Sequence, residues 1–325
     1  MKAFAIAHIF AAASAIQHLE LKYMNYLAEF GKVINNLEEF EQRLENFIAT
    51  DKAIENMNAE GNTWTAGHNQ FSDWSKEEYK NILGAKKPIQ SSDEDAKLTS
   101  FDETKNADTL NWRDWGAVTP VKNQGQCGSC WAFASTGALE GAHFVASGQL
   151  ETFSEQQLVD CTTSLGNYGC QGGWPYYSAQ YYKSNGAIRE TDYPYTSSYG
   201  QVTGYCYDYY YDSTGVNVSD YRQPSSSPSQ VQAALNVAPL SVLVQAAEYA
   251  FQSYRSGVLR SYACGNAVDH AVLAVGYGQE NGVNYWLVKN SWGTTWGDQG
   301  YIKLEMDNYS GACGVQTNAA LYTSN

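Results

Sequence analysis

The sequence from Gln124 to Trp131 reads Gln-Gly-Gln-Cys-Gly-Ser-Cys-Trp and leads into a run of small and apolar residues. The run from Ser129 to Ala146 predicts a buried helix, which Ser129 can cap and Gly148 can terminate. Cys130 then lies in the first helical turn, where unpaired backbone N–H groups and the positive end of the helix dipole favour an anion. The position therefore favours a reactive thiolate at Cys130.

The cysteine count points to the same residue. The seven cysteines all lie C-terminal to residue 126: Cys127, Cys130, Cys161, Cys170, Cys206, Cys264 and Cys313. Three disulfide bonds would leave one thiol over, and an odd thiol in an exported protein is a candidate nucleophile. Counting alone leaves the pairing open, because six cysteines allow many connectivities.

Residues 1–15 predict a signal peptide, which is the reason for expecting export. Lys2 precedes an apolar run from Ala3 to Ala12, and Ala13-Ser14-Ala15 offers a small-residue cleavage site. A buried N-terminal helix is the alternative, and His8 within the run favours it slightly. Export implies an oxidising compartment with paired cysteines, so we expect the secretory pathway, ending in a lysosome, a vacuole or the extracellular space.

Composition narrows the class of protein. The chain has 325 residues, 43% hydrophobic and 17% charged, which predicts a globular protein of two or three folding units. Thirty-four acidic against twenty basic side chains give a formal charge of −14, which argues against a nucleic-acid partner. No apolar run is long enough to predict a membrane span, and nothing repeats at a fixed period.

A cysteine nucleophile needs a base, and five histidines are available. His8, His18 and His68 precede residue 105. His143 lies on the same predicted helix as Cys130, roughly 20 Å away at 1.5 Å per residue, which excludes it. His270 remains, and Asn290 can orient its ring by accepting a hydrogen bond from the second nitrogen.

Three other interpretations compete with a cysteine–histidine pair. Cys127-x-x-Cys130 could be a thiol–disulfide redox pair, although such a motif should follow a core strand and this one follows a loop. A zinc site is disfavoured because no second closely spaced Cys/His pair exists. A catalytically silent binding protein is disfavoured by the intact set of nucleophile, base and orienting group.

The segment before residue 105 carries two patterns. Six residues fall on one face of a predicted helix within residues 20–60: Glu39, Arg43, Phe47, Thr50, Ile54 and Asn58. Gly67, Asn69, Phe71 and Asp73 then alternate at period two, which predicts a short strand. The polar stretch 91–95 predicts an exposed linker that is open to proteolysis.

The remainder of the chain changes character twice. Residues 165–225 predict loops with short helices, and we interpret the nine tyrosines between Tyr193 and Tyr221 as aromatic filler in a disulfide-held surface. The last hundred residues predict strands at 240–244, 271–277, 285–288 and 301–304. A helical half followed by a strand-rich half predicts an α+β pair of subdomains with a cleft between them.

These motifs together resemble the papain-like cysteine peptidases, closest in type to the cathepsin L group, from about residue 36 to the end. The resemblance implies a papain-like two-subdomain fold, helical on one side and β-barrel-like on the other, preceded by a helical prodomain. It implies a cysteine endopeptidase that hydrolyses peptide bonds without metal or cofactor. Four positions match its oxyanion donor, nucleophile, base and orienting residue: Gln124, Cys130, His270 and Asn290. Trp292 matches the tryptophan that shields the His–Asn hydrogen bond, and Trp296 the aromatic wall on the leaving-group side.

The early segment is similar to the family's propeptide. The helical face resembles its interspersed Glu-Arg-Phe-Asn-Ile-Asn pattern, with Thr50 in place of an Asn, and residues 67–73 match its second motif. After the expected signal peptide at 1–15, the resemblance implies an inhibitory propeptide at 16–105 whose tail crosses the cleft, and a mature domain at 106–325. Cleavage is expected within 100–110. The mature domain divides into a helical subdomain at about 116–215 and a β-rich subdomain at about 216–325.

The family pattern also implies finer assignments. The disulfides are Cys127–Cys170, Cys161–Cys206 and Cys264–Cys313. Two glycines pair with the substrate backbone, Gly172 and Gly173. The pocket for the second residue before the scissile bond is lined by Trp174, Pro175, Leu243, Asp269, Ala271 and Asn318, with Asn318 at the floor and an apolar residue preferred. We expect a monomer inhibited by its own propeptide and by cystatin-type inhibitors. Two glycosylation sequons fit the secretory route, at Asn217 and Asn308.

Overall fold

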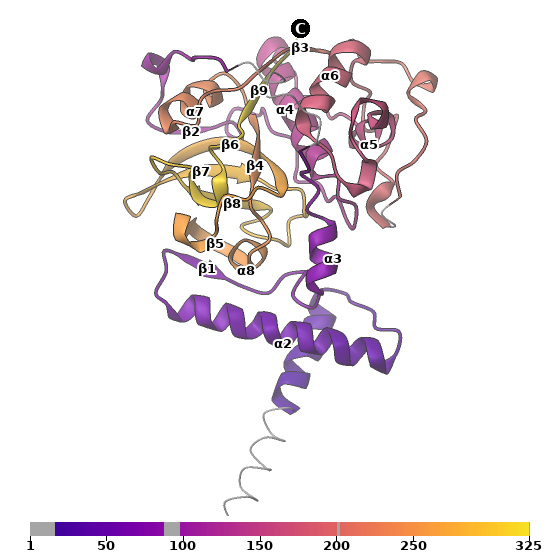
Figure 1. Cartoon of the computed structure of the whole chain (residues 1–325), viewed down its shortest axis with the longest axis vertical. Coiled ribbons are helices and arrows are strands. Elements are labelled where there is room, and N and C mark those ends of the chain that lie inside the picture. Colours follow the sequence, from indigo (N-terminus) through magenta and orange to yellow (C-terminus); the bar gives the residue numbers. More distant parts are fainter. Residues whose placement is uncertain (1–16, 88–97, 200–201, 325) are drawn as a thin grey trace, which may run out of the picture.

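The computed structural model describes residues 17–87, 98–199 and 202–324, and it is shown in Figure 1. The expected signal peptide at 1–15 and the expected linker at 91–95 lie outside the described residues. Within those residues, no helix is both long and apolar enough to cross a membrane.

The N-terminal segment (residues 17–87) is helical, as predicted. Residues 17–29 form a helix, followed by α2 (Leu37–Ala59), the short strand β1 (Trp64–Ala66) and α3 (Lys76–Asn81). Asn36 caps α2 by accepting a hydrogen bond from the Glu39 backbone N–H. Phe47 and Ile54, both on the predicted face, are buried, which confirms the helical periodicity.

The strand predicted over residues 67–73 is wrong, because these residues form a turn. The Asn69 side chain accepts a hydrogen bond from the Phe71 backbone N–H at 2.9 Å, and the Ser72 hydroxyl accepts one from the Asn69 N–H at 3.1 Å. Such local side-chain bonds compete with the ladder of a sheet, so the chain reverses here. The extended residues lie directly before it, where β1 pairs antiparallel with β5 (Tyr254–Leu259).

The helical subdomain is built around α4 (Cys130–Ser147), which is buried over most of its length. Gly148 ends this helix in the left-handed conformation, with φ of 75°, as predicted. Ser129 precedes the helix but does not cap it, because its hydroxyl is hydrogen-bonded to the Tyr195 hydroxyl at 2.7 Å. Two further α-helices and four short 3₁₀ helices complete this part: α5 (Glu155–Cys161), α6 (Pro175–Asn185), η3 (Thr163–Leu165), η4 (Gly169–Gln171), η5 (Ser197–Tyr199) and η6 (Asp208–Tyr210).

The strands of the described residues form one largely antiparallel sheet, which confirms the α+β class and the four predicted C-terminal strands. Its strands run in the order β1-β5-β8-β7-β6-β4-β9-β3, with β2 paired to β6. The remaining bounds are β2 (Leu110–Asn111), β3 (Val218–Arg222), β4 (Leu240–Val244), β6 (His270–Glu280), β7 (Val283–Lys289), β8 (Tyr301–Glu305) and β9 (Ala320–Ser324). Short helices connect them: η2 (Glu103–Lys105), α7 (Pro228–Leu235), α8 (Tyr249–Gln252), η7 (Ser261–Ala263) and η8 (Ala312–Gly314).

Figure 1 shows the two subdomains side by side, with α4 running along their junction and the N-terminal segment covering one end. Apolar side chains of α4 and of β6 share one buried cluster, which joins the helical and β-rich parts. The start of α4 is therefore held next to the start of β6. This arrangement places Cys130 and His270, far apart in sequence, at the same junction.

Three disulfides join the pairs Cys127–Cys170, Cys161–Cys206 and Cys264–Cys313, and Cys130 is free and buried. Because Cys127 is bonded to Cys170, it is not the redox partner of Cys130. Cys161, Cys206 and Asp208 lie close enough to suggest a metal site, but the two sulfurs are bonded to each other and cannot serve as thiolate ligands.

Candidate active site

Cys130 is the first residue of α4 and has no exposed surface. Backbone groups of Ala271, Gly84 and Trp131 lie close enough to the thiol to lower its pKa, so the N-terminal segment reaches the sulfur. Burial raises the pKa of Cys130 to about 11, more than those backbone groups lower it. In this covered state the helix start does not yield the thiolate that the sequence favoured.

His270 and Asn290 meet because their strands are neighbours. His270 begins β6 and Asn290 directly follows β7, and the two strands pair antiparallel, so both residues lie at one end of the sheet. His270 Nε2 and Asn290 Oδ1 are 2.8 Å apart. His270 Nδ1 is buried and has no hydrogen-bond partner among the described residues, which leaves this nitrogen available to act as a base.

The Trp292 ring stacks on the His270 ring, with centroids 4.5 Å apart and planes at 25°. It thereby covers the histidine ring and keeps water from it. Burial lowers the pKa of His270 to about 4, although the hydrogen bond to Asn290 acts in the opposite direction. The covered site therefore holds a neutral imidazole beside a neutral thiol.

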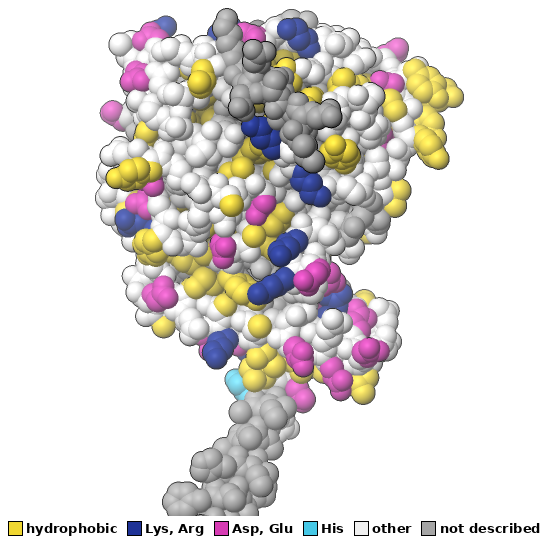
Figure 2. Space-filling model, in the orientation of Figure 1, with side chains coloured by type: hydrophobic (Ala, Val, Ile, Leu, Met, Phe, Trp, Pro, Cys, Tyr) yellow, Lys and Arg dark blue, Asp and Glu magenta, His cyan; other side chains and the backbone are white. Residues whose placement is uncertain are grey.

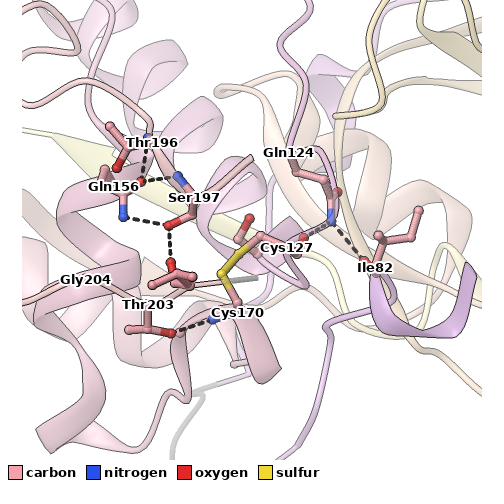
Figure 3. Close-up of a disulfide and its surroundings, with 12 residues drawn as sticks. Ile82, Gln124, Cys127, Gln156, Cys170, Thr196, Ser197, Thr203 and Gly204 are labelled. Carbon is pink, nitrogen blue, oxygen red and sulfur yellow. Dashed lines mark hydrogen bonds between the residues drawn. A yellow bond between two sulfur atoms is a disulfide. The ribbon is translucent and has the colours of Figure 1, made fainter. Parts of the chain in front are cut away.

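Gln124 is fixed by hydrogen bonds at both ends of its amide. Its Oε1 accepts hydrogen bonds from Ser291 Oγ at 2.8 Å and from Trp292 Nε1 at 3.1 Å. Its Nε2 then points toward the N-terminal segment and donates to the Ile82 carbonyl at 2.9 Å and to the Cys127 carbonyl at 2.8 Å (Figure 3). The amide that the sequence assigned to an oxyanion thus binds a peptide carbonyl oxygen.

Residues 82–87 of the N-terminal segment, called the crossing stretch below, pass over Cys130. The Gly84 carbonyl accepts a hydrogen bond from Gly173 N–H at 2.9 Å, and Ala85 N–H donates to the Asp269 carbonyl at 3.0 Å. A Cβ built on Gly84 would lie 1.8 Å from the Gly128 carbonyl oxygen, so no other residue fits there without a shift. The sequence indicated that the tail crosses the cleft, but nothing in its pattern marked these residues.

Aromatic side chains anchor the segment beside the site. Phe71 and Tyr79 approach the Trp292 ring edge-on, with centroids 5.2 and 5.7 Å away. Gln70 Nε2 donates to the Trp292 carbonyl at 2.6 Å. Trp296, expected to form a wall on the leaving-group side, is fully buried behind Trp292.

The residues expected to contact substrate are only partly brought together. Gly173 pairs with the crossing stretch in a parallel bridge to Ala85, and Asp269 lies on the other side of that residue. Leu243, Ala271 and Ala85 belong to one buried cluster, against which Trp174 packs. Gly172 also lies against the crossing stretch, since a Cβ built on it would be 2.9 Å from the Gly84 carbonyl oxygen. Pro175 and Asn318 are not part of the cluster. Asn318 is half-buried and donates to Thr317 Oγ1, and no contact among the described residues joins it to the pocket walls.

A group of buried charges lies behind Asn290 and was missed by sequence reasoning. Lys122 Nζ lies 2.7 Å from Glu155 and 3.6 Å from Glu140, and Lys289 Nζ donates to Thr119 Oγ1 at 3.0 Å. Burial lowers the pKa of Lys289 to about 8. These residues join the two subdomains, because Lys289 ends β7 while Glu140 and Glu155 lie on α4 and α5. In the sequence, the buried charges could have been noticed only as single charged residues within apolar runs.

The two sequons differ in their surroundings. Asn217 Nδ2 donates to the Tyr182 carbonyl at 3.1 Å, so its amide is engaged in the fold. Asn308 is exposed in a turn after β8.

The comparisons with known proteins agree with this geometry. The family model described as "Papain family cysteine protease" matches residues 106–323, and that of the "Cathepsin propeptide inhibitor domain (I29)" matches residues 23–79. The chain is 38% identical over 329 residues to digestive cysteine proteinase 1 of Homarus americanus, covering 98% of this chain and 99% of the relative. It is 40% identical to the oryzain gamma chain of Oryza sativa, covering 92% and 82%. Among solved structures, digestive procathepsin L 3 of Tenebrio molitor superposes with a TM-score of 0.81 at 32% identity, covering 94% and 99%.

Proposed function

Because the chain belongs to the papain family of cysteine proteases and carries the family's propeptide inhibitor domain, we propose that Cys130, His270, Asn290 and Gln124 form its catalytic apparatus. The Cys130 sulfur attacks the carbonyl carbon of a peptide bond, and its proton resides on His270. The imidazolium Nδ1 then protonates the leaving amine nitrogen, which leaves a thioester on Cys130. Water, deprotonated by His270, hydrolyses the thioester, releases the carboxylic acid and restores the thiol.

The observation that carries this proposal is the contact of a peptide carbonyl with the proposed oxyanion donor. Gln124 Nε2 donates to the Ile82 carbonyl at 2.9 Å, while the Gly84 backbone lies against the Cys130 thiol and lowers its pKa. A donor held at that distance from a carbonyl oxygen can stabilise the charge that develops during attack. Asn290 fixes the His270 ring by accepting from Nε2, which directs Nδ1 to the reaction.

We assign residues 16–105, called the prosegment below, to the inhibitory part of the precursor. The exposed stretch 102–105 supports cleavage within 100–110, because an endopeptidase needs accessible backbone. Phe101 is held from the mature side by the Gln230 side chain, which bonds both its N–H, at 2.8 Å, and its carbonyl, at 3.1 Å. Cleavage after this point would leave residues 106–325 as the active domain.

The pocket for the second residue before the scissile bond is proposed to prefer leucine or phenylalanine. Leu243, Ala271 and Trp174 offer apolar walls, and Asn318 at the proposed floor has no charge to pair with a substrate arginine. The preference among apolar side chains is modest, since one methylene changes binding by only about 1–3 kcal/mol.

The wider setting follows from the same assignment. We propose a monomeric enzyme of the secretory pathway, delivered to a lysosome, a vacuole or the outside of the cell, and inhibited by cystatin-type proteins. Asn308 is the better glycan acceptor because Asn217 uses its amide nitrogen within the fold.

Substitution of the nucleophile tests the proposed function. Processed protein carrying Cys130→Ala or Cys130→Ser is expected to lose peptide hydrolysis by at least about 10³-fold while keeping its thermal unfolding transition. Normal cleavage by the Cys130→Ala protein would contradict the assignment. A thiol–disulfide enzyme would instead reduce insulin, with dependence on Cys127 as well as Cys130.

A further inference from the structure

Residues 205–211, called the tyrosine loop below, expose an unusual aromatic surface. The five tyrosines of the loop are 80, 44, 70, 71 and 38% exposed, in the order Tyr205, Tyr207, Tyr209, Tyr210 and Tyr211. With roughly 200 Å² per tyrosine, the rings expose on the order of 600 Å² together, at the upper limit for a patch on a monomer. They lie on a disulfide-held surface, as the sequence suggested, but their exposure means that they do not act as filler. Figure 2 shows hydrophobic side chains projecting from the upper right edge of the molecule, on the side of α5 and α6.

The exposed rings form a continuous row. Ring centroids are 6.5 Å apart between Tyr205 and Tyr207, 6.1 Å between Tyr207 and Tyr210, and 4.3 Å between Tyr210 and Tyr209. A partner lying along the loop would therefore meet several aromatic faces and edges in succession.

Interactions beneath the row hold the loop in place. Cys206 is bonded to Cys161 of α5, and Asp208 accepts a hydrogen bond from the Tyr181 hydroxyl at 2.5 Å. Tyr211 packs against Tyr193, with centroids 5.1 Å apart. The loop is thus ordered before any partner arrives, which lowers the entropic cost of binding.

The segment that carries the row contains charged residues of one sign only. No lysine or arginine occurs from Glu190 to Tyr221, whereas this segment contains five carboxylates, of which Asp212 in the loop's neighbourhood is exposed. Aromatic faces attract guanidinium and ammonium groups, and nearby carboxylates add to that attraction. The surface therefore suits a cation and repels an acidic partner.

The tyrosine loop also connects with the cleft. Thr203, two residues before it, lines a hollow of about 480 Å³ together with Asn167, Tyr168 and Gln171, directly beside the glycines at 172–173. Lys86 of the crossing stretch lies in this hollow and donates from Nζ to the Gln171 carbonyl. The crossing stretch therefore shows that a chain leaving the cleft past Gly173 can place a cationic side chain in this hollow, between the cleft and the tyrosine loop.

We propose that the tyrosine loop is a docking surface, outside the catalytic cleft, for an arginine- or lysine-rich segment of a protein substrate. The proposal rests on the proposed proteolytic function and adds to it a preference for cationic substrates. The row of rings binds the cationic side chains of the substrate. A peptide bond some residues away along the same substrate then enters the cleft and is cleaved.

The test compares peptide substrates that share one cleavage sequence. The first is the short peptide alone. The others carry an N-terminal extension of four Arg, four Gln or four Glu, joined by a Gly-Ser linker of about 12 residues, which spans roughly 20 Å. For processed wild-type enzyme we expect the Arg extension to raise kcat/KM at least about fivefold over the Gln extension, through KM, and the Glu extension to lower it.

Three variants locate the effect. The triple variant Tyr207→Ser, Tyr209→Ser, Tyr210→Ser should reduce the Arg advantage to less than about twofold, whereas Phe at the same three positions should retain it because the rings remain. A matched control replaces two exposed tyrosines of the β-rich side, Tyr262→Ser and Tyr309→Ser, which are 69 and 84% exposed, and should keep the full advantage. All variants should hydrolyse the short peptide at the wild-type rate.

An undiminished Arg advantage in the triple Ser variant would overturn the proposal, as would equal rates for the Arg and Gln extensions. A wild-type dimer in sedimentation that the triple Ser variant abolishes would assign the surface to a second copy of the chain and overturn it too. Failure of the proposed function is separate, because it would abolish hydrolysis of the short peptide. Docking would then still be measured by fluorescence anisotropy of the labelled Arg-extended peptide on the Cys130→Ala protein, with the same order of variants expected.

Discussion

The globular part of the prosegment (residues 17–81) and the crossing stretch (82–87) hold the enzyme in different ways. The globular part uses side chains, since Phe71 and Tyr79 pack on Trp292 and are almost fully buried. The crossing stretch buries Ile82 and Leu83 as well, but where it passes Cys130 it uses its backbone, through hydrogen bonds of Gly84 and Ala85 with the mature domain. The difference indicates that affinity resides in the globular part, whereas the blockade comes from a backbone that presents no side chain to the nucleophile.

The globular part is also held together by polar interactions between its own residues. Asp73 is fully buried and receives a salt bridge from Lys32 at 2.7 Å and a hydrogen bond from the Tyr26 hydroxyl at 3.1 Å. Asp73 closes the turn that carries Phe71, so these bonds hold the anchor in position. A buried charge with such partners is costly to disrupt.

Removal of the aromatic anchor should have the largest effect. The prosegment made as a separate chain, residues 16–105, is expected to inhibit the processed enzyme at submicromolar concentration. Phe71→Ala should weaken inhibition by about 3–5 kcal/mol, or about 10²- to 10⁴-fold, because a buried ring is lost. Inhibition constants from peptide hydrolysis measure this.

Two further variants control for folding of the prosegment. Phe47→Ala removes a ring from the prosegment's own core and should weaken inhibition together with loss of helical circular dichroism. Leu37→Ala, at a position 70% exposed, should change neither. Absence of inhibition by the intact prosegment at micromolar concentration would count against the anchoring role altogether.

Acid should weaken binding of the prosegment through the crossing stretch, because the titrating groups His270 and Asp269 lie beside it and not beside Phe71. Burial in the closed state lowers the pKa of His270 from its ordinary 6.5 to about 4, so, to the extent that the crossing stretch supplies this burial, the closed state is favoured above pH 6.5 and loses stability as the pH falls toward 4. Asp269 acts in the opposite direction, because burial raises its pKa to about 6. In processed Cys130→Ala protein the two shifts oppose each other below pH 6, so the dissociation constant of the prosegment should rise between pH 6.5 and 6 and change little from there to pH 4. In an Asp269→Asn background it should rise by up to about tenfold per pH unit over the whole range. A constant that is flat or falls with acid in the Asp269→Asn background would contradict the coupling.

The next largest effect on inhibition is expected from Gly84→Ala, which adds a single methyl group beside Cys130. Gly84→Ala places a Cβ 1.8 Å from the Gly128 carbonyl oxygen, and the backbone must shift to relieve the clash. Overpacking of this kind costs about 1–3 kcal/mol, which corresponds to about 5- to 150-fold weaker inhibition. Lys80→Ala, on the exposed side of α3, is the control and should leave inhibition unchanged. If Gly84→Ala inhibited as well as the unchanged prosegment, backbone contact would not be the means of blockade.

The smallest effect concerns the pocket beside Ala85. The crossing stretch puts only a methyl group there, so the pocket's preference must be measured on substrates. We expect kcat/KM for Leu or Phe at the second position before the scissile bond to exceed that for Arg severalfold. Asn318→Glu should narrow or reverse the gap, with the effect shrinking as the pH falls and the carboxylate is protonated. No response to Asn318→Glu would place residue 318 away from the pocket floor.

Sequence patterns predicted the elements that carry one periodicity throughout. The α4 helix follows from its apolar run and from Gly148, and β4 was predicted with the bounds it has. His270 could be singled out because few histidines compete with it, and the structure places it 2.8 Å from Asn290, its expected partner. The helical prodomain likewise follows from a face repeated over six positions.

Features set by tertiary contact could not be predicted in this way. The alternation at 67–73 imitates a strand, but local bonds of Asn69 and Ser72 turn the chain. Ser129 has the residue type of a cap, yet Tyr195, remote in sequence, takes its hydroxyl. Gly84 acts through its backbone, which leaves no signature in the side-chain pattern.

Alkylation of Cys130 in precursor and processed enzyme tests most directly whether a single covered thiol carries the activity. Intact mass and peptide mapping after iodoacetamide treatment at pH 7 report the rate and position of labelling for both forms in one sample. Because the covered thiol has its pKa raised to about 11, we predict labelling at Cys130 at least about 100-fold slower in the precursor than in the processed enzyme, with hydrolysis lost in proportion to the label. Equal labelling of the two forms, or activity that survives full modification of Cys130, would contradict the account.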